Sequence, residues 1–310
     1  MSAREVALLV VRDVFGPAAR GAQASFDYRS RKAHLDPRDR AFASELAYGS
    51  IKMRRTIDWY LRPYIGPRLK TLPMAIAEIL RLGTYQLVWM KGVAARAAVH
   101  ESVSLALRYG HKGTAGLVNA VLRKLSDAPP QPPANEGDDV DDAIATRYSF
   151  PTWMVMRLRQ RFPQLDVETL LAAINQPPPL WLRVNLAHSD VAQTREALRA
   201  LHLDVSTSEI VAEALRVEGE MTAAGLSELA DGRWDVQSES SCMPVDILDP
   251  QPGETVLDLC SGRAHKTVQI AGRLRGSGNV VAIDADARKT ARALSVLERD
   301  GISGVAVVTA

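Results

Sequence analysis

The chain has 310 residues, of which 46% are hydrophobic and 24% are charged. This length predicts two or three domains, and the composition is that of a globular protein. No stretch approaches the ~20 apolar residues that span a bilayer. The charged residues within 1–15 argue against a secretory signal. The two cysteines, Cys242 and Cys260, fit neither a disulfide framework nor a zinc site and suit a reducing cytoplasm.

The net charge of +2 hides an uneven distribution. Residues 1–128 hold 21 Lys and Arg against 10 Asp and Glu, whereas residues 129–235 hold 9 against 17. This division predicts that the first part of the chain meets a polyanion such as a nucleic acid. The alternative is that arginine-rich helices simply present solvated faces.

Residues 1–128 are predicted to form an all-helical domain. Asp36 followed by Pro37 is typical of a helix cap with proline in the first turn. Apolar residues recur at near-helical spacing in three stretches. They are Leu46, Ile51, Ile57, Tyr60 and Leu61, then Ile76, Ile79, Leu80, Leu82 and Leu87, then Leu117, Val118, Val121, Leu122 and Leu125.

Residues 129–142 combine prolines with an acidic cluster and predict a linker. Beyond it, residues 143–233 are expected to form a small α+β module. Its first helix would open at Phe150-Pro151 and turn Trp153, Met154 and Leu158 inward. The strand "PPPLWLRVNL", a helix, and the strands "LDVSTSEI" and "EALRVEG" would follow.

Residues 234–310 read as a short helix and then alternating apolar strands and helices. The strands are "PGETVLDLC", "NVVAIDAD" and "SGVAVVTA", separated by "HKTVQIAGRLRG" and "ARKTARALSVLERDG". This alternation predicts a parallel sheet with right-handed crossovers. Three strands make about half of a Rossmann-like sheet and would leave apolar faces and an open edge. We therefore expect a truncated version of a longer enzyme.

A loop and an acid lie where such sheets bind ligands, beyond the carboxyl ends of the strands. The loop Cys260–Lys266 follows the first strand, and Asp284 ends the second. A carboxylate at this distance can accept hydrogen bonds from a ribose diol, which indicates adenosylmethionine or a dinucleotide. The absence of G-x-G-x-x-G disfavours the dinucleotide. The alternative is an ordinary turn between strand and helix, with Asp284 capping the next helix.

"TVLDLCSGRAHKT" followed by "VVAIDAD" resembles the first two cofactor motifs of bacterial ribosomal RNA (cytosine-5) methyltransferases of the RsmB type. "LDPRDRAFASELAYGSIKMRRTIDWYL" and "ILRLGTYQLVWM" resemble the NusB-like amino-terminal domain of that family. "RYSFPTWMVMRL" with "NQPPPLWLRVN" resembles its middle segment, and "WDVQSESSCMPVDIL" its lead into the methyltransferase domain. These blocks stand in the order of the family and cover almost the whole chain.

The resemblance implies methylation of cytosine C5 in small-subunit ribosomal RNA with S-adenosyl-L-methionine as cofactor, without a metal or a membrane. Asp258 would shape the cofactor loop. The implied cofactor-binding residues are Cys260, Ser261, Gly262, Arg263, Ala264, His265, Lys266 and Asp284. The helical domain would dock on ribosomal RNA through phosphate contacts. The candidates, each alternatively part of a solvated surface, are Arg38, Arg40, Arg54, Arg55, Arg68 and Lys70.

The loop departs from the family, whose Pro-Gly-Gly is Arg263-Ala264-His265 here. Glycine serves where the backbone takes a positive φ or approaches a ligand, and alanine there costs roughly 1–2 kcal/mol. Gly262 offers a flexible point two residues earlier. His265, at a helix start, is expected to be neutral and to face solvent rather than to act in catalysis.

The cysteines depart as well. The family attacks cytosine C6 with a thiolate, using cysteines in Pro-Cys and Thr-Cys motifs that residues 1–310 lack. Neither Cys242 nor Cys260 is expected to be a nucleophile, so no catalytic residue is predicted and the chain alone is expected to be inactive. One alternative is a non-catalytic NusB-like RNA-binding protein with a vestigial cofactor domain. An NAD-dependent enzyme is disfavoured by the glycine pattern.

Overall fold

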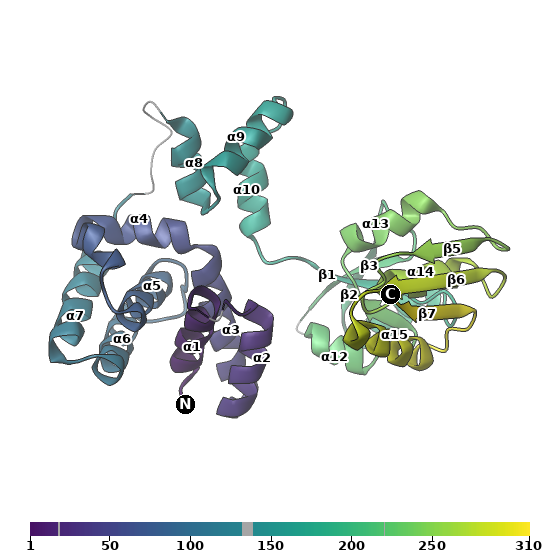
Figure 1. Cartoon of the computed structure of the whole chain (residues 1–310), viewed down its shortest axis with the longest axis horizontal. Helices are drawn as coiled ribbons and strands as arrows, with labels where there is room; N and C mark the ends of the chain where they lie inside the picture. Colours follow the sequence, from purple (N-terminus) through teal and green to yellow (C-terminus); the bar gives the residue numbers. More distant parts are fainter. Residues whose placement is uncertain (18, 132–138, 220) are drawn as a thin grey trace. The chain divides into compact units, whose positions relative to one another are not determined.

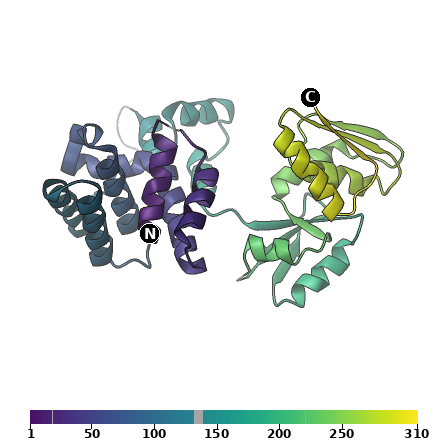
Figure 2. The ribbon, with the colours of Figure 1, turned by 60° about the horizontal axis from the view of Figure 1, so that its bottom comes forward.

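The computed structural model describes residues 1–17, 19–131, 139–219 and 221–310. The described chain forms two compact units, Met1–Gln176 and Pro177–Ala310, drawn in Figure 1 and Figure 2. Half of the predicted linker, residues 132–138, lies outside the described residues. Across the described ranges, no helix has both the length and the apolar character needed to cross a membrane.

The first unit is helical, as the sequence predicts. Its amino-terminal elements are α1 (Ala3–Phe15), α2 (Ala22–Ala33), α3 (Pro37–Lys52), α4 (Arg54–Ile65), the 3-10 helix η1 (Gly66–Lys70), α5 (Met74–Val88), α6 (Ala95–Tyr109) and α7 (Lys112–Asp127). The predicted cap at the start of α3 is confirmed, because the side chain of Asp36 accepts the N–H of Asp39 at 2.8 Å. Helix α5 runs through the core, with every residue from Ala75 to Gln86 buried.

Helix α3 packs closely against Tyr85 of α5 at Gly49. A Cβ on this glycine would lie 2.0 Å from Cζ of Tyr85. The Tyr85 side chain cannot easily move to make room, because its ring is buried and its hydroxyl donates a hydrogen bond to Glu45 at 2.6 Å. Glycine therefore sets the distance between these two helices.

Three more helices complete the first unit, α8 (Val140–Tyr148), α9 (Thr152–Arg161) and α10 (Val167–Asn175). Helix α8 begins two residues before the predicted linker ends, capped by the side chain of Asp139. Arg55 of α4 is hydrogen-bonded to the end of α8 and to the turn that follows α8. Its guanidinium donates to Thr146 Oγ1 at 3.1 Å, to the Phe150 carbonyl at 2.9 Å and to Thr152 Oγ1 at 2.9 Å.

The inward face of α9 differs from the prediction. Val155 is fully buried, whereas Trp153 is 61% exposed and Met154 is 36% exposed. Val155 and the partly buried Leu158 are three residues apart, and they pack with α8 and α10. The two large side chains one and two positions before Val155 therefore point outward.

The second unit opens with an antiparallel sheet in the order β2-β3-β1-β4. Its elements are β1 (Leu180–Val184), α11 (Val191–Arg199), β2 (Asp204–Thr207), β3 (Ala214–Glu218), α12 (Ala223–Glu228) and β4 (Trp234–Val236). Strand β4 pairs with β1 across the predicted boundary between residues 233 and 234. The module built around this sheet thus extends to Val236, while residues 143–176 belong to the first unit.

A parallel sheet in the order β5-β6-β7 follows, as predicted. Its elements are α13 (Glu239–Leu248), β5 (Thr255–Asp258), α14 (His265–Arg273), β6 (Asn279–Asp284), α15 (Ala287–Arg299) and β7 (Val305–Thr309). Val280 packs under α14 and Val307 under α15. Leu257 and Val308 are 55% and 40% exposed, so apolar side chains remain uncovered, as three strands alone predict.

The two sheets are joined through a buried carboxylate. Glu213, just before β3, accepts both Nε and Nη2 of Arg273 on α14 at 2.8 Å, and Nε2 of Gln269 at 2.8 Å. Arg273 also reaches Asp246 of α13 at 2.7 Å. Although burial opposes it, hydrogen bonding to Arg273 and Gln269 lowers the pKa of Glu213. The charged network thus fixes α14 against the antiparallel sheet.

Gly49→Ala tests the packing of α3 on α5. The added methyl group must displace the Tyr85 ring, so we expect a loss of about 1–3 kcal/mol of unfolding free energy in urea. Gly116→Ala on α7 is the matched control, since nothing lies within 4 Å of its Cβ, and it should stabilise by ~0.5–1 kcal/mol. Equal effects of the two substitutions would contradict the packing argument.

Candidate functional site

A pocket of about 390 Å³ lies beyond the carboxyl end of β5. This volume falls within the range of small-molecule sites. The segment after β4, helix α13 and the loop into α14 enclose it. Its lining residues are Val236, Gln237, Ser238, Ser241, Asp258, Cys260, Ser261, Gly262, Arg263, His265 and Lys266.

Acids at the ends of β5 and β6 hold the loop in place. Asp258 Oδ2 accepts the hydroxyl of Thr267 on α14 at 2.8 Å. Asp284 Oδ2 accepts the N–H of Gly262 at 3.0 Å, and its Oδ1 accepts the N–H of Asp286 at 2.9 Å. These backbone donors, Asp286 first and then Gly262, hold the pKa of Asp284 below its ordinary value. Asp284 is thus an ionised anchor of the loop.

The loop uses two residues with positive φ, Gly262 at 57° and Ala264 at 67°. The positive φ at Gly262 therefore does not replace the one at position 264, because both residues adopt it. Ala264 is fully buried, and its side chain packs with Val268, Ala293 and Leu297 in the core under α15. The Cβ that replaces a glycine hydrogen points into the protein and leaves the pocket open.

Six of the eight residues predicted for the cofactor line this pocket. They are Cys260, Ser261, Gly262, Arg263, His265 and Lys266. Ala264 is not among the lining residues, because its side chain belongs to the core. Asp284 is also absent from the lining and contributes through its hydrogen bond to the loop.

The pocket has polar atoms fit to receive a cofactor. The hydroxyl of Ser261 and Nε2 of Gln237 are buried and have no hydrogen-bond partner among the described residues. A buried polar atom without a partner costs roughly 1–3 kcal/mol, so a ligand that offers these two atoms hydrogen bonds would gain affinity. The pocket therefore fits a ligand that carries hydrogen-bonding groups.

The imidazole of His265 lies at the start of α14, partly exposed, with Nδ1 3.9 Å from Asp235 Oδ2. Burial lowers the pKa of His265, against the opposing effect of Asp235, and the charges of Arg263 and Arg183 lower it further. A lowered pKa favours the neutral imidazole, which agrees with the neutral ring expected from the sequence. Burial and the neighbouring arginines, rather than the helix dipole assumed there, are the causes of the lowered pKa.

The two cysteines lie in different surroundings. Cys242 of α13 is fully buried, and burial raises the pKa of its thiol to about 11. Thiolate is the nucleophilic form of cysteine, so Cys242 is unsuited to attack. Cys260 is exposed in the loop.

Gln237 and Arg183 belong to this site but are not among the residues predicted from the sequence. Arg183 of β1 is 1% exposed and donates to Gln237 Oε1 and to Asp235 Oδ2. The signal was present in "LWLRVNL", where a charge interrupts an apolar strand, and in "WDVQ", whose acid lies opposite that charge on β4.

The six basic residues predicted to contact RNA fall into two groups. Arg54 pairs with Glu78 at 2.8 Å, Arg55 holds the turn after α8, and Arg40 donates to Ser30 and Asp27. These three guanidinium groups are engaged within the first unit. The others are exposed and form no ion pair with any described residue; they are Arg38, Arg68 and Lys70.

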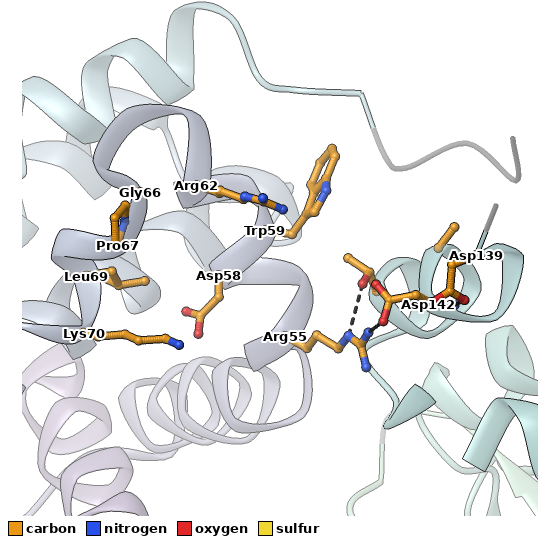
Figure 3. Close-up of a pocket in the computed structure, with 12 residues that line it drawn as sticks. Arg55, Asp58, Trp59, Arg62, Gly66, Pro67, Leu69, Lys70, Asp139 and Asp142 are labelled. Atoms are coloured by element: carbon orange, nitrogen blue, oxygen red, sulfur yellow. Dashed lines mark hydrogen bonds and ion pairs between the residues drawn. The ribbon is translucent and has the colours of Figure 1, made fainter. Parts of the chain in front are cut away.

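Lys70 lies in a cavity of about 980 Å³ between α4, η1 and α8, together with Trp59 and Arg62 (Figure 3). The acidic residues that line this cavity with Lys70 form hydrogen bonds or ion pairs with other residues. Asp58 accepts Arg81 at 2.6 Å, and Asp142 pairs with Arg55 at 2.6 Å. Arg62 is exposed and, like Lys70, forms no ion pair within the described chain.

Comparison with known proteins divides the chain into three matched segments. Residues 1–127 match the NusB family, residues 150–224 match the ferredoxin-like domain of RsmF/B-like methyltransferases, and residues 245–310 match 16S rRNA methyltransferase RsmB/F. A probable ribosomal RNA small subunit methyltransferase B of Synechocystis is 31% identical over 99% of this chain and 69% of its own length. The chain belongs to the RsmB/F family of 16S rRNA methyltransferases.

The family resemblance expected from the sequence is thereby confirmed. A second relative of this RsmB/F chain, the probable methyltransferase B of Bacillus subtilis, is 30% identical over 87% of the chain and 60% of its own length. The chain thus spans about three fifths to two thirds of these relatives. The crystal structure of PH0851 shares the fold, with a TM-score of 0.74 at 19% identity over all of this chain and 70% of that protein.

The environment of His265 predicts a pH dependence. Because its folded pKa lies below the ordinary 6.5, the unfolded chain binds the proton first, and stability falls as the pH drops through that value. In His265→Gln this loss should be smaller when urea midpoints are compared above and below pH 6.5. His100→Gln, at a ring that is 76% exposed, should keep the wild-type dependence. Identical profiles for wild type and His265→Gln would refute the assignment.

Proposed function

We propose that this chain binds S-adenosyl-L-methionine beyond β5 and ribosomal RNA on its helical unit, as part of an rRNA cytosine-5 methyltransferase of the cytoplasm. The observation that carries the proposal is the pocket formed by the loop Cys260–Lys266, with its unpartnered buried polar atoms. Membership of the RsmB/F family supports the same reaction class.

The residues have separate roles in this proposal. The bound cofactor supplies the methyl group. Gly262 lines the pocket with a φ of 57° and carries no side chain, so the loop backbone can approach the ligand at this position. Asp284 fixes that amide through Oδ2 and retains further lone pairs for the ribose hydroxyls.

Methyl transfer to cytosine C5 needs a thiolate that adds to C6. Among residues 1–310, Cys242 is buried with a raised pKa, and Cys260 belongs to the cofactor loop. We therefore propose that these residues bind both ligands but supply no nucleophile. Transfer of labelled methyl groups to small-subunit ribosomal RNA by this chain alone would contradict that statement.

Titration calorimetry with adenosylmethionine tests the cofactor site. We expect the wild-type chain to bind, and Asp284→Ala to weaken binding about tenfold or more, because a hydrogen bond to a charged group contributes ~1.5–3 kcal/mol. Asp286→Ala is the control on the neighbouring α15 cap and should bind as the wild type does.

A different result would favour the second candidate function. If the chain binds ribosomal RNA but shows no heat with adenosylmethionine, it is a NusB-like RNA-binding protein whose cofactor domain is vestigial. The basic charge of residues 1–128 supports RNA binding under either proposal.

The unpaired cations predict which substitutions weaken RNA binding. Arg68→Gln with Lys70→Gln should reduce affinity for small-subunit ribosomal RNA. The slope of log K against log salt should fall by about 0.7–0.9 for each lost phosphate contact. The melting temperature should stay unchanged, since neither side chain has a partner among the described residues.

Arg54→Gln is the matched comparison. It removes a partner of Glu78, whose side chain is 2% exposed, and should cost ~1–3 kcal/mol of stability. If instead Arg54→Gln weakened RNA binding with unchanged melting while the double variant bound normally, the assignment of the two groups would be wrong.

A further inference from the structure

One wall of the cofactor pocket comes from outside its loop. Gln237, directly after β4, lines the pocket and is 5% exposed. Its Oε1 accepts Nε of Arg183 at 2.9 Å. Its Nε2 has no partner anywhere in the described ranges of the chain. This amide therefore has one end fixed and one end unused.

The orientation of the amide follows from the chemistry of arginine. A guanidinium group only donates hydrogen bonds, so the atom that faces Arg183 has to be the oxygen of Gln237. Arg183 itself cannot rotate away, because its Nη2 donates to Asp235 Oδ2 at 2.8 Å and the side chain is 1% exposed. Nε2 is thereby held as a donor that needs an acceptor.

The neighbouring groups indicate which acceptor fits. Ser261 is 7% exposed, and its Oγ is a second buried polar atom without a partner among the described residues. Its backbone N–H already donates to the carbonyl of Ile283. Arg263 and Lys266 line the same pocket, and the carboxylate of Asp258 is bonded to Thr267. Two cations and free donors suit a carboxylate group better than a neutral ring nitrogen.

The geometry also separates the two ends of the ligand. Asp284 at the end of β6 is the candidate for the ribose hydroxyls, and it does not line the pocket. Gln237 lies on the wall formed by residues 236–241. The amino-acid end of a nucleoside-linked ligand is therefore the part that this wall receives.

We propose that Nε2 of Gln237 donates a hydrogen bond to the carboxylate of adenosylmethionine. Arg183 is the positioning residue that orients the amide. This inference rests on the proposed function, because it assigns one end of the same cofactor.

The test compares two ligands that differ in this carboxylate. Calorimetry of the full chain measures adenosylmethionine and decarboxylated adenosylmethionine on wild type and Gln237→Glu. Glutamate keeps the size and the bond to Arg183 but replaces the donor by an acceptor oxygen. We expect adenosylmethionine to bind about tenfold or more weakly to Gln237→Glu. Binding of the decarboxylated ligand should not weaken by more than about twofold.

Gln237→Met is the second variant, which removes the donor without adding charge. It should lose most of the preference for the carboxylated ligand, and its melting temperature reports on folding. Weakening of both ligands alike, or of neither, in both variants would overturn the role of Gln237 and leave the proposed function standing. If the wild type binds neither ligand, both proposals fail together.

Discussion

The buried ion pair between Arg183 and Asp235 is the constraint on which the second unit depends. Taking a guanidinium and a carboxylate out of water costs several kcal/mol for each ion, so the pair adds little net stability. Its effect is on register, because the two residues lie opposite each other on β1 and β4. Any slip would leave a buried charge unpaired. Asp235 also accepts Arg299 of α15 at 2.8 Å, so the same pair ties the antiparallel sheet to the methyltransferase fold and places Gln237.

Periodicity was enough to predict most of the elements but not this pair. The strands β5, β6 and β7 are apolar runs that each follow closely after a glycine, and hydrophobic burial decides their place. Strand β4 has three residues, too few to show an alternation, and an arginine in a strand is usually at the surface. Only the pairing of β1 with β4 shows that Arg183 meets an acid. The loop residues could be found from the sequence, whereas the opposite wall of the pocket could not.

Charge counting was similarly limited in the helical unit. It identified residues 1–128 as basic, which is a sum over side chains and holds whatever their partners are. Arg54 and Arg55 lie next to each other in sequence, yet both are engaged by groups far away along the chain, Glu78 and the turn after α8. Partners at such separations exist only in the folded chain. The cations left for a polyanion are therefore a subset that depends on tertiary structure.

In the loop Cys260–Lys266, an alanine at position 264 is tolerated where a glycine was expected. A left-handed alanine costs roughly 1–2 kcal/mol, and burial of the Ala264 methyl against α15 returns about 0.8 kcal/mol. Burial therefore offsets part of the strain, which helps the loop to keep its shape without glycine at this position. Had the Cβ pointed into the pocket, no such gain would exist and the ligand would lose space. At position 264, the direction of the Cβ into the core under α15 is what leaves the pocket open.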